Sequence, residues 1–149
     1  MTAVKKDIYI EQGATFILAF QWVNQGPVVG GVVTPGTPKN LTGWVVRMQV
    51  RKSQQDTAQI DANTTNAKII LGRDPSTENP TTGAFPAADP TNGWIYVNLT
   101  PTDTNMLTTK AAKYDLEAEN PAGKVYRLLQ GAVTIDPNIT QATSEPVLT

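Results

Sequence analysis

Apolar and polar residues alternate along several short segments of this sequence, and this period of two constrains the fold more than any other feature. The clearest example is WVVRMQVR at residues 44–51, where the apolar side chains that share one face are Trp44, Val46, Met48 and Val50. A β-strand places successive side chains on opposite faces, whereas a helix would scatter these positions around its axis. The segment is therefore predicted to be a strand with one buried face.

Six further segments show the same alternation, or a short apolar run between turn residues: 7–11, 16–22, 68–71, 94–99, 114–119 and 125–135. The segment at 7–11 is expected to be an edge strand that turns into the sheet after Gly13. Thr100, Pro101 and Asp103 have the residue types that begin a helix, and they predict a single helical turn through Leu107. No segment suits a crossover between parallel strands, so two antiparallel sheets packed face to face are predicted.

The chain has 149 residues and no second block of distinct composition. This length is that of one ordinary domain, and it is long enough to bury a core without disulfides. We therefore expect a single β-sandwich domain over residues 1–149. Its last part, residues 137–149, is expected to be an extended C-terminal tail.

Composition excludes much of enzyme chemistry. The chain has no cysteine and no histidine, which removes the thiolate nucleophile, the commonest general base and the commonest metal ligands. Its net charge of −1 provides no field to gather nucleic acid or an anionic membrane. No segment has the apolar length of a signal core or a membrane span. We expect a non-enzymatic protein made in a bacterial cytoplasm, with no cofactor, no metal, no nucleic acid and no membrane as partner.

Two long loops interrupt the strands. Residues 25–38 centre on Gly30-Gly31, which four valines flank symmetrically: Val28, Val29, Val32 and Val33. This segment is either a β-ribbon folded onto its own domain or an apolar ribbon exposed for a partner. Residues 72–93 hold four prolines, with Phe85 as the large apolar residue. They form either a contact with a partner or an insertion without consequence.

The hairpin at 113–137, KYDLEAENPAGKVYRLLQGAVTIDP, combines core and surface positions. Its predicted core residues are Tyr114, Leu116, Leu128, Val133 and Ile135. Gly131 interrupts the second strand and is predicted to form a bulge. Tyr114 is either an ordinary core tyrosine or one whose hydroxyl binds the backbone, as at the corner before a late strand of immunoglobulin-like sandwiches.

Two sets of side chains are candidates for binding sites. Asp115, Glu117 and Glu119 project from one face of a strand and could hold a cation, but a solvated outer face explains them fully. Three tryptophans, at 22, 44 and 94, could form a platform for a sugar. Each lies in or beside an apolar strand, however, so core or rim positions are expected for at least two of them.

Several motifs resemble a known family. The opening I-x-x-G-A-T-x-x-L (from Ile10) is followed by N-L-T-G-W and R-M-Q-V-R, and later by Y-D-L-E and G-K-V-Y-R-L-L-Q-G-x-V-T-I-D-P-x-I-T. Together they resemble small structural proteins of tailed bacteriophages and prophages, and the N-terminal immunoglobulin-like domain of phage baseplate upper proteins. The resemblance covers roughly residues 7–22, 40–52 and 93–140. The two long loops lie outside it, and it transfers no catalytic residue.

The resemblance implies a fold and a role. The expected fold is all-β: an immunoglobulin-like antiparallel β-sandwich of about seven strands, with one short helical turn and two long loops. The implied role is that of a virion component in the tail, baseplate, neck or fibre attachment, and we expect it to act there as a docking or adaptor subunit. Its partners would be other virion proteins in a multi-copy symmetric assembly.

Candidate interface residues lie in the two loops and the tail: Val28, Val29, Val32, Val33, Phe85, Ile139, Val147 and Leu148. Apolar anchors of this kind supply much of the energy of protein association. A capsid decoration or head-fibre protein would use the same fold. A carbohydrate-binding module is a further alternative, and it would require exposed aromatic rings.

Overall fold

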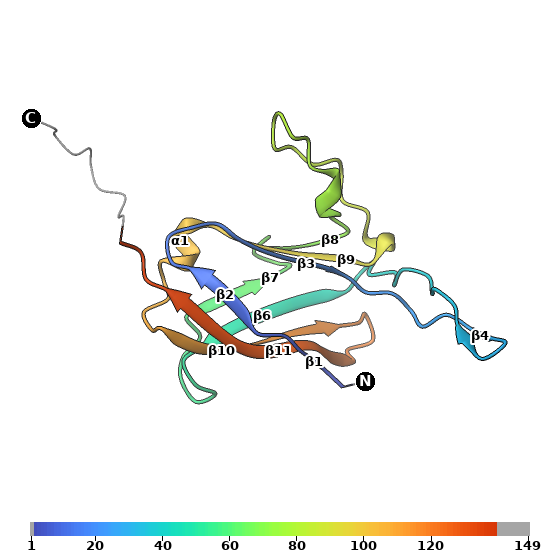
Figure 1. Ribbon diagram of the computed structural model, residues 1–149, viewed down its shortest axis with the longest axis horizontal. Helices are drawn as coiled ribbons and strands as arrows, with labels where there is room; N and C mark the ends of the chain where they lie inside the picture. Colours follow the sequence, from blue (N-terminus) through green and yellow to red (C-terminus); the bar gives the residue numbers. More distant parts are fainter. Residues whose placement is uncertain (1, 140–149) are drawn as a thin grey trace, which may run out of the picture.

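The computed structural model describes residues 2–139, which form two β-sheets packed face to face (Figure 1). The larger sheet contains β1 (Val4–Lys5), β2 (Ile8–Glu11), β6 (Val45–Arg51), β7 (Ile60–Asn63), β10 (Ala111–Glu119) and β11 (Val125–Asp136). The smaller sheet contains β3 (Phe16–Gln21), β8 (Ile69–Leu71) and β9 (Trp94–Leu99). A separate hairpin is formed by β4 (Val28–Val29) and β5 (Val32–Val33). The helical turns are η1 (Pro75–Thr77), η2 (Pro90–Asn92) and α1 (Pro101–Thr104).

The strand order makes this an immunoglobulin-like sandwich. The larger sheet has the order β1-β11-β10-β6-β7, with β2 also paired to β11, and the smaller sheet has the order β3-β9-β8. An immunoglobulin sandwich likewise places its last two strands beside the third strand in one sheet, and pairs its second and fifth strands in the other. The predicted fold class is confirmed, and all seven predicted strands are present.

The N-terminal strands are arranged differently from the expectation. β2 does not turn into the sheet that holds β3, because the chain changes sheets between residues 12 and 15. Instead, β1 and β2 both pair in parallel with β11, with Val4 opposite Leu129 and Ile10 opposite Ile135. The remaining pairs of both sheets are antiparallel. The first and last strands of the sandwich are thus neighbours.

β7 is a strand that the alternation did not predict. It has only two apolar residues, Ile60 and Ala62, and both are buried. It pairs antiparallel with β6, with Met48 opposite Ala62. A four-residue segment inside a polar stretch carries too little periodicity to stand out, and pairing with a long neighbour stabilises it.

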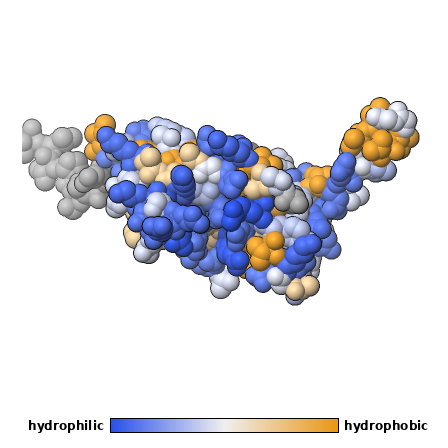
Figure 2. Space-filling view, turned by 90° about the horizontal axis from the view of Figure 1, so that it is seen from below, coloured by the Kyte–Doolittle hydropathy of each residue, from blue (hydrophilic) through white to orange (hydrophobic). Residues whose placement is uncertain are grey.

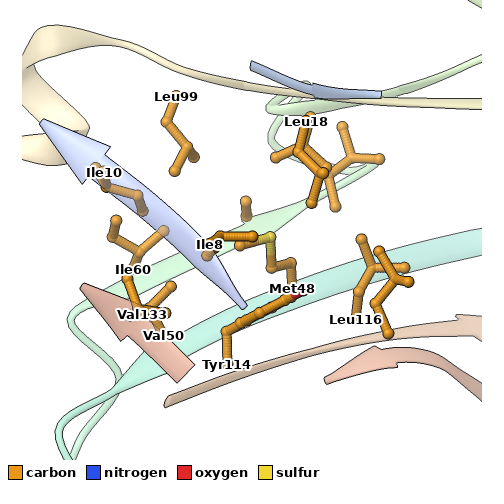
Figure 3. Packing of buried hydrophobic residues seen from close by; sticks show 14 of the residues in the cluster. Ile8, Ile10, Leu18, Met48, Val50, Ile60, Leu99, Tyr114, Leu116 and Val133 are labelled. Atoms are coloured by element: carbon orange, nitrogen blue, oxygen red, sulfur yellow. The ribbon is translucent and has the colours of Figure 1, made fainter. Parts of the chain in front are cut away.

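The core lies between the two sheets and is built from the alternating positions of both (Figure 3). Val46, Met48 and Val50 of β6 are fully buried, as are Ile95, Val97 and Leu99 of β9. Figure 3 shows Met48 beside Ile8 and Leu116, between the layers. The five core residues predicted for the 113–137 hairpin are all buried, which confirms that part of the prediction.

The predicted helical turn is confirmed as α1, which begins with a capping box between Thr100 and Asp103. Thr104 at its end is fully buried, and its hydroxyl accepts a hydrogen bond from the N–H of Gly13 at 2.9 Å. The same hydroxyl lies 2.9 Å from the carbonyl of Ala14, to which it donates. A buried polar group is tolerated when its hydrogen bonds are made, so this threonine fixes the turn where the chain changes sheets.

Gly131 does not form the predicted bulge. It pairs with Tyr114, and the register shift lies at Leu128, between the pairs Leu116–Leu129 and Glu117–Arg127. A Cβ on Gly131 would lie 2.3 Å from the carbonyl oxygen of Lys6, so the glycine is needed for the close passage of the N-terminal segment.

Tyr114 combines the two roles considered for it. Its ring is buried in the core, and its hydroxyl donates to the carbonyl of Lys6 at 2.6 Å. The acceptor lies far upstream in the sequence rather than a few residues away, so this is not the corner of immunoglobulin domains. The bond instead joins β10 to the segment between β1 and β2.

Candidate functional site

Both long loops leave the same end of the sandwich. The arm at 25–38 follows β3, and the loop at 72–93 leads into β9, which pairs with β3 so that Gln21 lies opposite Trp94. Backbone bonds join their bases: Trp22 N–H donates to Gly93 at 2.8 Å, and Leu41 N–H donates to Pro90 at 2.9 Å. In Figure 1 the arm extends from this end and the loop rises from it, while α1 lies at the other end.

The segment at 25–38, hereafter the arm, is a preformed β-hairpin. Val28 pairs with Val33, and Val29 with Val32. Gly30 and Gly31 form the turn with φ values of 58° and 78°, the left-handed conformations that the tightest hairpin turn requires. Below the strands, Thr34 N–H donates to the carbonyl of Pro27 at 3.0 Å, and Asn24 N–H to that of Thr37 at 2.8 Å. The backbone pairing continues to the base of the arm.

The arm carries apolar side chains on both of its faces, and none of them packs on the sandwich. The exposed fractions of Val28, Val29, Val32 and Val33 are 61%, 63%, 66% and 57%. Figure 2 shows the result as a hydrophobic knob that projects beyond a largely hydrophilic body. The arm is therefore an exposed apolar ribbon, and it is not folded onto its own domain.

Aromatic rings pack where the arm meets the body. The ring centroids of Trp22 and Trp44 are 5.3 Å apart at an angle of 80°, and Tyr126 lies within 6 Å of both. The ammonium of Lys39 lies 5.4 Å from the centroids of both tryptophan rings. Trp22 and Trp44 are half-buried and pack against the core. Because their rings meet edge to face and Lys39 lies over both, these two tryptophans do not form a flat platform for a sugar.

Phe85 lies differently from the valines of the arm. It is half-buried, its ring centroid lies 5.5 Å from that of Tyr96, and the Arg73 guanidinium lies 4.5 Å from its ring centroid. Tyr96 is on the outer side of β9 and is nevertheless buried, because the loop at 72–93 covers it. This burial raises the pKa of the Tyr96 phenol above its ordinary value, although the Arg73 charge opposes the shift. Phe85 thus holds its loop against the smaller sheet.

The remaining interface candidates belong to the tail. Ile139 is 97% exposed, and β11 ends near α1, at the end of the sandwich opposite the arm (Figure 1). Val147 and Leu148 lie outside the described residues. The structure therefore brings the four valines of the arm together and places Ile139 far from them.

The acidic row on β10 faces arginines. Arg47 of β6 lies 3.2 Å from Glu117 and 3.4 Å from Glu119, and Arg127 of β11 lies 3.4 Å from Asp115. Burial and the neighbouring Glu117 charge raise the pKa of the Asp115 carboxyl, against the opposing effect of the arginines. These partly exposed ion pairs form a charged ladder across the outer face of the larger sheet, in keeping with a solvated surface.

Within residues 2–139, no group of three or more acidic, histidine or cysteine side chains is placed to hold a metal ion. Over the same part of the chain, no helix has the length and hydropathy needed to cross a bilayer.

Comparisons with known proteins gave limited similarity. No family model matches the chain, and no curated protein matches it. Among solved structures, a mutant of the SrpA adhesin from Streptococcus sanguinis aligns at 12% identity and a TM-score of 0.35, over 87% of this chain and 54% of the adhesin chain. AggA, the major subunit of aggregative adherence fimbriae type I from Escherichia coli, aligns at 12% identity and a TM-score of 0.27, over 91% of this chain and 99% of AggA.

The chain spans about half the length of the SrpA structure. The resemblance to phage structural proteins stays a prediction. What the strand order establishes by itself is an immunoglobulin-like β-sandwich that carries an exposed apolar arm.

Proposed function

We propose that this chain is a non-enzymatic structural subunit of a bacteriophage virion, and that it docks a neighbouring virion protein through its arm. The observation that carries the proposal is the exposure of four clustered valines on a hairpin that projects from the body. Isolated exposed apolar residues are ordinary on protein surfaces, but a contiguous apolar knob is typical of an interaction site.

The arm can contribute binding energy to docking. Covering one half-exposed valine contributes about 1 kcal/mol, at roughly 25 cal/mol per Å² of apolar surface removed from water. The arm is already folded, since its turn and backbone pairs are formed without a partner. Docking would therefore cost little conformational entropy, and more of the gain would appear as affinity.

The shape of the arm indicates the kind of receptor. Val28 and Val33 form one cross-strand pair and Val29 and Val32 the next, so the two faces of the hairpin are both apolar. A flat surface would cover only one face. A cleft between two elements, or between two subunits, would cover both, and such clefts are common where many copies of a protein assemble.

The test is incorporation into particles. Replacing the four arm valines with threonine keeps side-chain shape and strand preference but adds hydroxyl groups that would lose hydrogen bonds on burial. Mass spectrometry of particles from the strain that encodes the chain should show it at reduced copy number. A matched control replaces Val4, Val45 and Val125, which are exposed valines on the sandwich itself.

The control should be incorporated at the wild-type level. If the chain is absent from purified particles, the assignment to a virion is wrong. If the arm variant is incorporated as fully as the control, the arm is not the docking element.

A further inference from the structure

The two sheets have four outer edges, and three of them are protected against pairing with another strand. β1 and β2 lie among charged residues, including Lys5, Lys6 and Glu11, and β8 is only three residues long. At β7 the side chain of Asn66 accepts from the N–H of Asn63 at 3.0 Å and donates to the carbonyl of Asp61 at 2.9 Å. Short length, charge and side-chain capping are the usual means by which sheets prevent edge-to-edge association.

The fourth edge, β3, has none of these protections. Its sequence is FILAFQ, six residues without a charge, a proline or a glycine. Within residues 2–139 it pairs on one side only, with β9. Ile17 is 49% exposed, and Phe16 and Phe20 are only partly buried at the margin of the core. An unprotected apolar edge of this length is an established place for strand addition.

The hydrogen-bond pattern shows which backbone groups of β3 are free. Along an antiparallel pair, bonding residues alternate with residues that face away. Asn98 and Trp94 of β9 bond to β8, through Lys68 and Gly72, while Trp22 bonds to Gly93 of the incoming loop. It follows that Phe16, Leu18 and Phe20 bond toward β9. The N–H and C=O groups of Ile17, Ala19 and Gln21 therefore face the open edge.

This edge is complementary to itself. If two copies meet antiparallel about a two-fold axis at Leu18, Ile17 of each copy lies opposite Ala19 of the other, and the free groups of these residues bond in pairs. On the core side, Phe16 lies opposite Phe20 and Leu18 opposite Leu18. The large Ile17 thus meets the small Ala19, and each partly buried phenylalanine gains an aromatic neighbour. Cross-strand pairs of this kind stabilise antiparallel sheets.

We propose that β3 is a self-association edge, through which two copies of this chain join their smaller sheets into one continuous sheet. The occupant of the edge is a second copy because the facing pairs from Phe16 to Phe20 in this register are all apolar, and because symmetric two-fold contacts are the commonest in homo-oligomers. The proposal does not rest on the function proposed above, since it involves none of the arm valines.

The experiment measures the oligomeric state of the full chain by sedimentation velocity at increasing concentration. Ala19→Pro removes one N–H that faces the open edge and no bond to β9, so the fold should tolerate it. The expected result is a dimer in the wild-type chain and a dissociation constant raised at least about tenfold in Ala19→Pro. Ala19→Val keeps the N–H and is the matched control, and it should still dimerise.

A second measurement reads the register directly. The chain has no cysteine, so an introduced thiol has no competitor. A mixture of Ile17→Cys and Ala19→Cys chains should form a mixed disulfide under mild oxidation, whereas Ile17→Cys alone should form much less. If Ala19→Pro does not fold, Ile17→Lys tests the same edge with a charge on its outer face.

Three results would overturn the proposal. The first is a wild-type chain that stays monomeric at every concentration. The second is a dimer whose dissociation constant is unchanged in the two edge variants, Ala19→Pro and Ile17→Lys. The third is a dimer lost on replacing the arm valines but kept in the edge variants, which would show that the arm joins the two copies. In contrast, loss of incorporation into particles with dimerisation intact concerns only the arm.

Discussion

Tyr114 connects the interior of the sandwich to the segment that passes over Gly131. Its hydroxyl donates to the carbonyl of Lys6, and its ring lies within the buried core cluster (Figure 3). Burial, together with the nearby charge of Asp7, raises the pKa of the phenol to about 12 from an ordinary value of 10.0. The neutral, donating form is therefore the one that the fold stabilises.

Replacing Tyr114 with phenylalanine should lower the free energy of unfolding at neutral pH by about 1 kcal/mol, because one buried hydrogen bond is lost. The pH dependence should change as well. Unfolded tyrosine loses its proton near pH 10, and folded Tyr114 near pH 12, so between these values the folded state binds more protons and stability falls as pH rises. The contribution is fully present below pH 10.

Urea unfolding at neutral pH and at pH 11 measures both effects. The variant should lose less stability than the wild-type chain between the two conditions. Tyr9→Phe, at an exposed position, is the control and should stay within about 0.5 kcal/mol of wild type at neutral pH. An equal alkaline loss in Tyr114→Phe and wild type would contradict the assignment.

Gly131→Ala tests the close passage of the N-terminal segment. The added Cβ would lie 2.3 Å from the Lys6 carbonyl oxygen, so β1 and the segment after it must shift. We expect a loss of about 1–3 kcal/mol in the free energy of unfolding, the usual cost of inserting an atom where there is no space. Gln130→Ala, at the exposed neighbouring position, is the control. A variant as stable as the control would show that the segment moves freely.

At the scale of elements, the loop at 72–93 is a cover for the smaller sheet rather than a free projection. η1 and η2 are capped by Asp74 and Asp89, whose side chains accept from the backbone N–H groups of Ser76 and Thr91. Phe85 lies over Tyr96, which is thereby protected from water. The loop is ordered by its own caps and by one aromatic contact.

Phe85→Ala should therefore lower stability by at least about 1 kcal/mol, since an aromatic pair and its buried area are lost together. It should also lower the pKa of Tyr96 toward its ordinary value, because burial is the main cause of the increase. Ultraviolet absorbance titration of the phenols follows this change. Thr82→Ala in the exposed part of the same loop is the control, and an unchanged titration in Phe85→Ala would show that Phe85 does not cover Tyr96.

The elements with strong alternation could be predicted from the sequence. β6, β9 and β10 present three or more buried positions two residues apart, and for such a pattern only a strand buries one whole face. The start of α1 could also be predicted, because Thr100, Pro101 and Asp103 cap and begin the helix through interactions between residues close in sequence. For the arm, only the position of the turn could be predicted, and the residue pair Gly30-Gly31 indicates it.

Features that depend on distant partners could not be predicted. Gly131 suggested a bulge, whereas its actual constraint is Lys6, which a strand pattern does not show. The bulge itself lies at Leu128, beside Leu129, and two adjacent buried leucines were the signal for it. Whether the valines of the arm lay on the body or projected from it depended on the path of the chain after β3.

For the whole molecule, the arm and the sandwich are expected to be independent in stability. The arm valines are exposed and do not belong to the core cluster, so the sandwich gains nothing from them. Replacing residues 27–34 with Asn-Gly should leave the free energy of unfolding within about 0.5 kcal/mol of wild type, with an unchanged denaturant slope. Urea titration tests this. A larger loss would show that the arm supports the aromatic cluster at its base.

The pairing of the first strands with the last one also has a consequence for how the chain folds. Val4 lies beside Leu129 and Ile8 beside Val133. The larger sheet therefore cannot be completed until its first strands, β1 and β2, and its last strand, β11, are all present. During synthesis, β1 and β2 cannot pair until β11 has left the ribosome. Contacts of such long sequence separation slow folding, typically to milliseconds or longer for sandwiches. The larger sheet is thus completed late, and the smaller sheet, whose strands all precede residue 100, is available to form first.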